Sequence, residues 1–323
     1  MKIIKKILLL LSVTLLLIII INYPKLNIIS GYAAKSTSSS IFVANRSVAL
    51  TNATDNNFSP INLANTAVSR ENNFALASTL GMLPRKAVYR NGLGSVLITK
   101  GYDTNKKELI PKRSIINTSL AYPFGNKSQK DTLFNTINYE KLDLSVSSIF
   151  ENSYQTRAVL VLYKNQLIAE RYGKGFTKDS RILGWSMTKS ILSTVYGIMQ
   201  YQGKLSVQDR APILEWENDD RKEITLHNLL QMNSGLAWDE NYDKISDVTK
   251  MLFLEDDMTK MQQKQQLIDS PNSSWNYSSG TSNLLSGILR QKLGSQQEYL
   301  DYWYRELIDK IGMNSMIIET DVK

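Results

Sequence analysis

The sequence predicts a protein of mixed α/β class (α+β), with strands in its first half and mostly helices after Ser186. The clearest strand signal is the β-branched, apolar run Ala158–Tyr163, which a short polar turn separates from a second run, Leu167–Tyr172. This pattern predicts a hairpin. Beyond Ser186, apolar residues recur at helical spacing instead, which indicates a change from strands to helices.

The N-terminus predicts an export signal or an uncleaved membrane anchor. Met1–Lys6 is cationic, and Ile7–Ile21 is apolar apart from one serine and one threonine. This run is somewhat shorter than the roughly 20 residues that a spanning helix prefers. However, Asn22–Lys25 follows it where a cleavage site with small residues would be expected. We therefore expect residues 1–21 to anchor the protein in the inner membrane, facing the periplasm or exterior, with secretion after cleavage as the alternative.

Short strands and loops are expected between this anchor and the hairpin. The small, polar segment Ala33–Ser40 predicts a tether, and Ile41–Ala44 a short strand. Thr51–Asn73 is rich in Asn, Thr and Ser and predicts a loop. Further strand candidates are Phe74–Leu83, Lys86–Arg90 and Ser95–Ile98.

A helix is predicted to begin at Ser186 and to end at Gly203. Its apolar stripe is made of residues at helical spacing, namely Ile191, Leu192, Val195, Ile198 and Met199. Lys189 lies one turn after Ser186 and therefore on the same face. The N–H groups and the dipole at a helix start favour negative charge at the Ser186 oxygen, and a nearby lysine can act as its base.

The remaining elements of this half are also predicted to be helices. Thr225 is a plausible N-cap for the first of them, and Asn233-Ser234-Gly235 would end it. The expected helices are Ile224–Met232, Asp247–Leu254, Thr259–Ile268, Thr281–Leu293 and Gln297–Ile311.

The composition excludes several kinds of hydrolytic site. The chain has no cysteine and a single histidine, His227, so thiolate nucleophiles and multi-histidine zinc sites are ruled out. A Ser-His-Asp triad would depend on His227, but no G-x-S-x-G motif accompanies it. The net charge is +8, yet Lys and Arg are interleaved with acidic residues, so no nucleic-acid partner is expected. Any nucleophilic catalysis would need Lys and Tyr for proton transfer, and we expect no metal and no cofactor.

Three segments resemble the β-lactamase-related serine hydrolases of the class C type, and in particular their 6-aminohexanoate-dimer hydrolase and esterase branch. These segments are Gly184–Ser190, Leu226–Leu236 and Trp275–Gly280. The segments around Ala33-Ala34-Lys35 and Ile41-Phe42-Val43 also resemble the N-terminal extension of membrane-anchored bacterial members. Ser278-Ser279 follows Tyr277 where class C β-lactamases have Y-x-N, which argues against β-lactamase activity itself.

The resemblance implies a role for each matching residue. Ser186 would be the acylated nucleophile, with its backbone N–H as one oxyanion donor, and Lys189 and Tyr277 would be the base and acid. The expected substrate is a small amide or ester. Residues expected to contact this substrate are Tyr242, Trp185 and Ser279.

The resemblance also implies an antiparallel sheet flanked by helices, with a helical subdomain over the site. Members carry a third motif after the tyrosine motif, but no His-x-Gly or Lys-Thr-Gly follows Gly280. We therefore expect a truncated member with three parts: an anchor or signal and tether (1–34), an N-terminal extension (35–150) and a partial hydrolase domain (151–323). The alternative to a membrane-anchored hydrolase is a non-catalytic member, a pseudoenzyme or gene fragment that at most binds peptidoglycan-like or peptide ligands.

Overall fold

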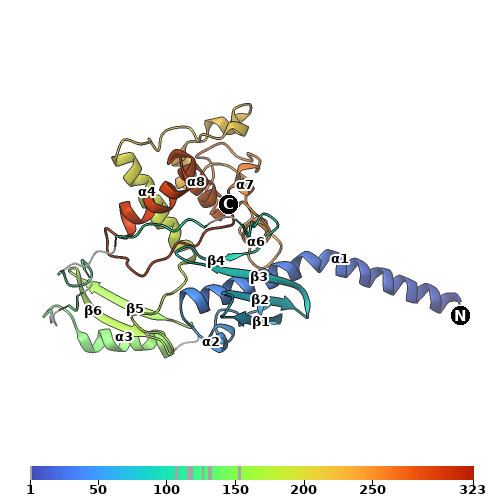
Figure 1. Cartoon of the computed structure of the whole chain (residues 1–323), viewed down its shortest axis with the longest axis horizontal. Helices are drawn as coiled ribbons and strands as arrows, with labels where there is room; N and C mark the ends of the chain where they lie inside the picture. Colours follow the sequence, from blue (N-terminus) through green and yellow to red (C-terminus); the bar gives the residue numbers. More distant parts are fainter. Residues whose placement is uncertain (1, 106–107, 115–118, 126, 130–132, 152–153) are drawn as a thin grey trace. The chain divides into compact units, whose positions relative to one another are not determined.

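A computed structural model describes residues 2–105, 108–114, 119–125, 127–129, 133–151 and 154–323 (Figure 1). The chain combines helices with antiparallel strands, which confirms the predicted mixed α/β class. The chain divides into two compact units. The first contains the chain up to Glu108 together with Ser186–Ser295 and Ile318–Lys323, and the second contains Leu109–Trp185 and Gln296–Ile317.

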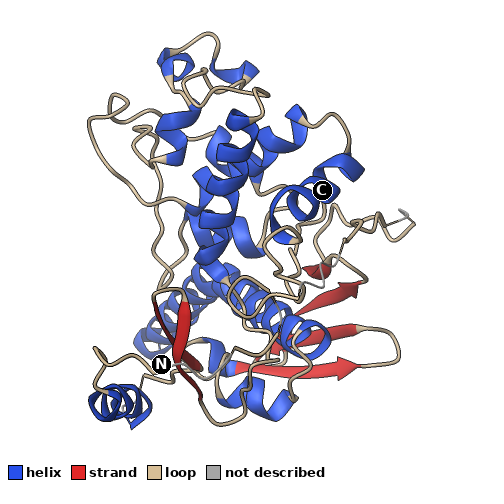
Figure 2. Cartoon of the chain, turned by 90° about the vertical axis from the view of Figure 1, so that its left-hand side faces the viewer, coloured by secondary structure: helices blue, strands red, loops and turns tan. Residues whose placement is uncertain are grey.

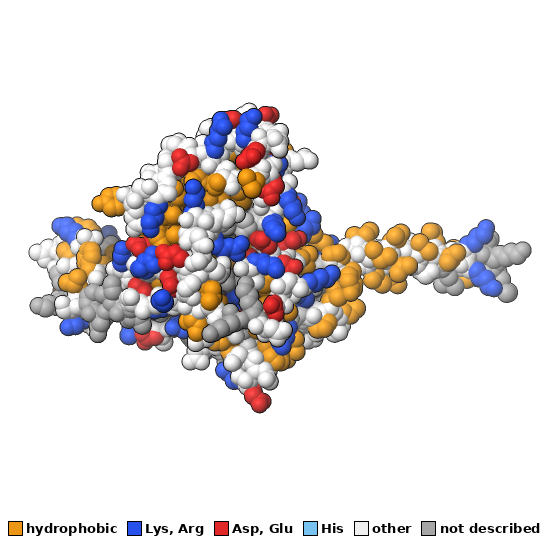
Figure 3. Space-filling view, turned by 45° about the horizontal axis from the view of Figure 1, so that its top comes forward, with side chains coloured by type: hydrophobic (Ala, Val, Ile, Leu, Met, Phe, Trp, Pro, Cys, Tyr) orange, Lys and Arg blue, Asp and Glu red, His pale blue; other side chains and the backbone are white. Residues whose placement is uncertain are grey.

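The first unit begins with α1 (Lys2–Ser38), a helix with two different halves. Its N-terminal half carries large apolar side chains that are exposed, seen in Figure 3 as orange atoms along the projecting helix. Its C-terminal half is buried from Ile28 onward and continues into a π-helical turn, Ser39–Val43. Within the described residues, one helical stretch, Ile4–Val43, is long and apolar enough to span a membrane.

The buried half of α1 packs on a four-stranded antiparallel sheet (Figure 1). The strands are paired in sequence order as β1 (Ala64–Ser69), β2 (Phe74–Thr79), β3 (Met82–Arg90) and β4 (Gly94–Leu97). Ala33 and Ala34 are fully buried against this sheet, because their small side chains let the helix approach closely. Two buried serines of α1 are hydrogen-bonded to hydroxyls of the sheet, Ser30 to Thr79 and Ser38 to Ser95, each at 2.8 Å.

Three expectations for this region are therefore wrong. Residues 33–40 are not a tether but a buried helical segment, so the helix runs through the boundary expected after residue 34. Ile41–Val43 lies in the π-helical turn and not in a strand. The segment 51–73 contains the end of α2 (Val48–Ala53), a 3₁₀ turn (Ile61–Leu63) and the edge strand β1. The strands expected within 74–98 are confirmed as β2, β3 and β4.

The helical part of the first unit follows Ser186. Its longest helices, α4 (Thr188–Tyr201) and α8 (Ser279–Lys292), pack against each other, and the buried Tyr196 hydroxyl donates to the Leu285 carbonyl at 2.7 Å. Thr225 caps the next helix as predicted. The remaining elements are 3₁₀ turns at Leu214–Trp216 and Asp220–Glu223, and helices α5 (Leu226–Leu230), α6 (Asp247–Phe253) and α7 (Thr259–Gln263).

The second unit contains the predicted hairpin. Strands β5 (Ala158–Tyr163) and β6 (Gln166–Tyr172) pair antiparallel and, in the described part of the chain, form a sheet of their own (Figure 2). Helix α3 (Tyr139–Glu151), which the sequence analysis did not predict, packs on β6. The predicted helix from residue 297 is confirmed as α9 (Gln296–Trp303), which continues into a π-helical turn, Tyr304–Ile308.

Candidate active site

Ser186 and Lys189 form the hydrogen-bonded pair that their spacing predicts. Ser186 lies in a short 3₁₀ turn, Trp185–Met187, directly before α4, and Lys189 lies in the first turn of α4. The Lys189 Nζ donates to the Ser186 Oγ at 3.1 Å. The serine is exposed and the lysine is half-buried. A proton can therefore pass directly between the two side chains, and the serine oxygen is open to an incoming carbonyl group.

A second hydroxyl, that of Ser279, contacts the same lysine. The distance from Lys189 Nζ to Ser279 Oγ is 2.9 Å, although the residues are 90 positions apart in the sequence. The contact arises because α4 packs on α8, which brings the first turns of the two helices together. Ser278 caps α8 by accepting from the backbone N–H of Thr281, which fixes where the helix begins and where Ser279 lies.

Tyr277 directly precedes Ser278, the N-cap of α8, and its ring lies beside the Lys189 side chain. The Lys189 Nζ is 4.8 Å from the centroid of the Tyr277 ring, within the range of a cation–π contact. The neighbouring Trp275 ring, largely exposed, is 6.2 Å from the tyrosine ring between centroids. The structure therefore brings the three residues together, with the Ser186 hydroxyl and the Tyr277 ring both close to the side-chain nitrogen of Lys189.

The segment Leu226–Leu236 holds the loop that carries Tyr277. Buried Asn228 closes a capping box with Thr225, and its amide also donates to Asn272 at 2.9 Å. Gly235 has a φ of 76°, and a Cβ there would lie 2.0 Å from a carbonyl oxygen of the same loop. The segment Leu226–Leu236 thus has a structural role, since its contacts fix the conformation of the chain just before Tyr277.

Glu240 is a member of the site that the sequence analysis did not single out. Its carboxylate accepts from the Ser279 backbone N–H at 2.9 Å, from the Ser279 hydroxyl and from the indole N–H of Trp238. It also accepts from the Tyr242 hydroxyl at 3.0 Å. The only signal in the sequence is an acidic residue within Trp238–Tyr242, and nothing local distinguishes it from Asp239.

Tyr242 and Trp185, both expected to contact substrate, are partly exposed. Burial of the Tyr242 hydroxyl, together with the negative charge of Glu240, raises its pKa to about 12, so it remains a hydrogen-bond donor at neutral pH. Trp185 belongs to the second unit, directly precedes Ser186 and has a left-handed backbone with a φ of 42°. Their contact with substrate remains a prediction, as does that of Ser279. Within the described ranges, no group of three or more His, Cys, Asp or Glu side chains could hold a metal ion.

The mixed fold and the Ser-Lys pair at a helix start are typical of serine hydrolases with an S-x-x-K motif. The sequence model described as "Beta-lactamase" matches residues 149–322, more than half of the chain. The chain therefore belongs to the beta-lactamase family, which confirms the family predicted from its motifs.

Solved structures to which the chain is similar include a candidate 6-aminohexanoate-dimer hydrolase from Bacillus anthracis and a candidate beta-lactamase from Bacteroides dorei DSM 17855. The first is 18% identical over 54% of this chain and 50% of that chain, with a TM-score of 0.46. The second is 20% identical over 54% of this chain and 51% of that chain, with a TM-score of 0.43. The chain thus spans about half the length of these proteins. No curated protein matched the sequence.

Proposed function

We propose that the protein is a serine hydrolase that cleaves an amide or ester bond of a small molecule through an acyl-enzyme at Ser186. The observation that carries this proposal is the contact of Lys189 Nζ with Ser186 Oγ at 3.1 Å, at the start of a long helix. An isolated S-x-x-K motif is common on solvated helices. Here the lysine is also held by Ser279 and faces the Tyr277 ring, which a solvated helix start does not require.

In the proposed acylation step, the neutral amine of Lys189 accepts the proton of Ser186 as Oγ attacks the carbonyl carbon. Negative charge develops on the carbonyl oxygen, and the Ser186 backbone N–H at the helix start is one donor for it, a contact worth about 3 kcal/mol. The proton held by Lys189 or Tyr277 then moves to the leaving amine or alcohol as its bond to the carbonyl carbon breaks. A water molecule, activated by the same groups, hydrolyses the ester at Ser186.

The test is intact-mass and peptide analysis of the protein after incubation with an activated ester such as p-nitrophenyl acetate. We expect an acetyl adduct on the peptide that contains Ser186, absent in Ser186→Ala and formed about 100-fold or more slowly in Lys189→Ala. Ser193→Ala is the matched control, because Ser193 is an exposed serine of the same helix. Absence of an adduct in the unaltered protein, or its persistence in Ser186→Ala, would overturn the proposal and favour a non-catalytic member.

We also propose that α1 is an uncleaved anchor that holds the protein at the cell envelope. The apolar exposed half of α1 passes without interruption into the half that is buried on the sheet. Carbonate extraction of membranes tests this idea: the anchored protein stays in the pellet with its N-terminus intact by mass. Recovery of a soluble form that begins after residue 21 would support secretion after cleavage instead.

A further inference from the structure

The carboxylate of Glu240 is joined to Lys189 through a single hydroxyl group, that of Ser279 (Lys189 Nζ to Ser279 Oγ, 2.9 Å). We propose that Glu240 is a positioning residue: it fixes the direction of the Ser279 hydroxyl and so orients the Lys189 amine toward Ser186. The proposal deepens the function proposed above and rests on it.

The four hydrogen bonds that Glu240 accepts fix the orientation of its carboxylate. Oε1 accepts from the Ser279 and Tyr242 hydroxyls, and Oε2 accepts from the Ser279 backbone N–H and the Trp238 indole N–H. An ionised carboxylate has about four acceptor positions, and these four donors use them. The position also suits an anion, because the Ser279 N–H belongs to the first turn of the 14-residue helix α8.

This arrangement determines which way the Ser279 hydroxyl points. A serine hydroxyl has one proton, and here that proton is donated to Glu240. Only its lone pairs are then left for Lys189, so the lysine must donate to Ser279. Both an ammonium group and a neutral amine can donate a proton to Ser279. When the neutral amine does so, its lone pair is free to accept the proton of its other partner, Ser186.

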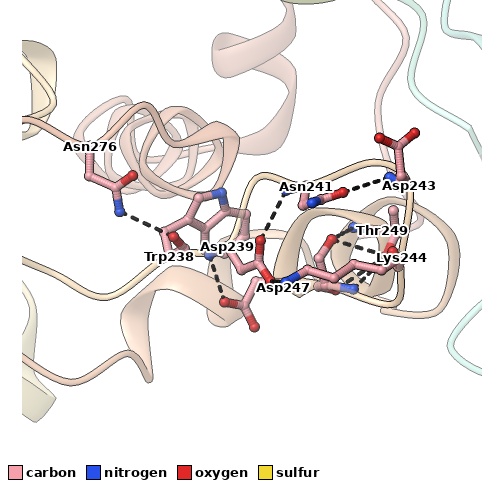
Figure 4. A network of polar contacts seen from close by, with 9 residues as sticks. Trp238, Asp239, Asn241, Asp243, Lys244, Asp247, Thr249 and Asn276 are labelled. Atoms are coloured by element: carbon pink, nitrogen blue, oxygen red, sulfur yellow. Dashed lines mark hydrogen bonds and ion pairs between the residues drawn. The ribbon is translucent and has the colours of Figure 1, made fainter.

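The loop that carries Glu240 is itself held by polar contacts on both sides of the residue (Figure 4). Before it, the carbonyl of Trp238 accepts from Asn276 at 3.1 Å. After it, Asp239 accepts from the Asn241 N–H at 3.1 Å and pairs with Lys244 at 2.8 Å. The hydrogen bond of Lys244 also holds the pKa of Asp239 below its ordinary value. Glu240 is therefore presented to α8 by a loop with a defined conformation.

In the proposed reaction, the negative charge of Glu240 matters because the charge of Lys189 changes. When Lys189 takes the proton of Ser186 it becomes a cation, and Glu240 lies one hydroxyl away to stabilise that charge. Glu240→Gln keeps the size of the side chain but removes the charge and replaces one acceptor with a donor. An amide that donates to Ser279 would turn its hydroxyl proton toward Lys189, which as an ammonium group has no acceptor for it.

The first experiment compares pre-steady-state acylation of Ser186 in the full chain and its variants. We expect Glu240→Gln to lower the acylation rate constant about 10- to 100-fold while the ester's dissociation constant changes less than about threefold. If Glu240 acts through Ser279, the double variant with Ser279→Ala is no slower than the slower single variant. Asp243→Asn is the matched control, since it removes an exposed carboxylate from the same loop, and its rate should be unchanged.

A second experiment does not depend on catalysis. In the Ser186→Ala background, trace acetylation by acetic anhydride, read by mass spectrometry against the other lysines, reports the neutral amine of Lys189. We expect Glu240→Gln to increase labelling of Lys189, because a Ser279 hydroxyl turned toward the amine no longer holds it by accepting its hydrogen bond, and Asp243→Asn to leave it unchanged. Equal labelling in the two variants would overturn the role of Glu240 even if Ser186 is acylated. Failure of acylation in the unaltered protein, with the labelling difference intact, would overturn the proposed function alone.

Discussion

Replacement of Gly280 by alanine is expected to damage both the fold and the site, because the glycine lies where α8 meets the Trp238 side chain. A Cβ at this position would lie 2.4 Å from the Trp238 ring and 2.5 Å from the Gln262 side-chain oxygen. Both neighbours are buried, with relative exposures of 8% and 0%. Neither can therefore move away into solvent, and displacement of the indole would also pull its N–H from Glu240.

The magnitude follows from comparison with a glycine that has no such neighbour. Gly197 lies within α4, and a Cβ there would meet no atom within 4 Å. Gly197→Ala should therefore stabilise the protein by about 0.5–1 kcal/mol through helix propensity alone. Gly280→Ala overpacks a close-packed contact, which typically costs about 1–3 kcal/mol. The two variants should consequently differ by about 1.5–4 kcal/mol, with opposite signs relative to the unaltered protein.

Urea unfolding followed by tryptophan fluorescence measures this difference, with all three proteins in the same detergent. The site effect is measured separately as the rate of Ser186 acylation in native buffer, which we expect to fall in Gly280→Ala and to remain unchanged in Gly197→Ala. If Gly280→Ala stabilises the protein as much as Gly197→Ala does, the contact with Trp238 is not close-packed and the reasoning fails.

Three further predictions concern the cap, the tyrosine and the first helix. Thr225→Ala removes the N-cap of α5 and should lower the free energy of unfolding by about 1 kcal/mol in urea, whereas Thr225→Ser should restore most of it. Folding raises the pKa of Tyr242 from its ordinary value of about 10 to about 12. The stability linked to the neutral phenol is therefore fully present below pH 10 and is lost as the pH rises through about 12. The difference in phenolate absorbance between the unaltered protein and Tyr242→Phe should titrate near pH 12, and a midpoint near 10 would contradict this prediction. Removal of residues 2–21 should leave a cooperatively folded protein by circular dichroism, whereas removal through Ser38 should abolish folding because it takes away the helix buried on the sheet.

The parts of the fold that depend on neighbouring residues could be predicted from the sequence. The hairpin follows from two β-branched runs around a short turn, and the Ser186–Lys189 pair follows from helical spacing. The N-cap at Thr225 was likewise predicted from a local signal. In each case, the residues that make the contact lie within a few positions of one another or within one hairpin.

The parts that depend on distant contacts could not be predicted in the same way. The small polar residues of Ala33–Ser40 have the composition of a solvated tether, but they are buried and their hydroxyls find partners far away in the sequence, for example Ser38 with Ser95 of the sheet and Ser39 with Glu319. The edge strand β1 was predicted as a loop because Asn, Thr and Ser dominate its surroundings, yet its backbone is paired along β2. Glu240 reaches Ser279 only because a loop and two helices are packed together, which no spacing rule describes.

The continuity of α1 also constrains where an anchored protein would hold its first unit. The exposed aliphatic residues extend to Ile21, and burial on the sheet begins near Ile28. Seven residues of α-helix cover only about 10 Å, so the sheet would lie close to the bilayer surface. Pro24 lies between the two parts and lacks the N–H that would complete the helical ladder there. Under the proposed anchoring, a bend at Pro24 is thus the main freedom left to the first unit. This differs from a flexible tether, which would allow the unit to turn freely away from the membrane.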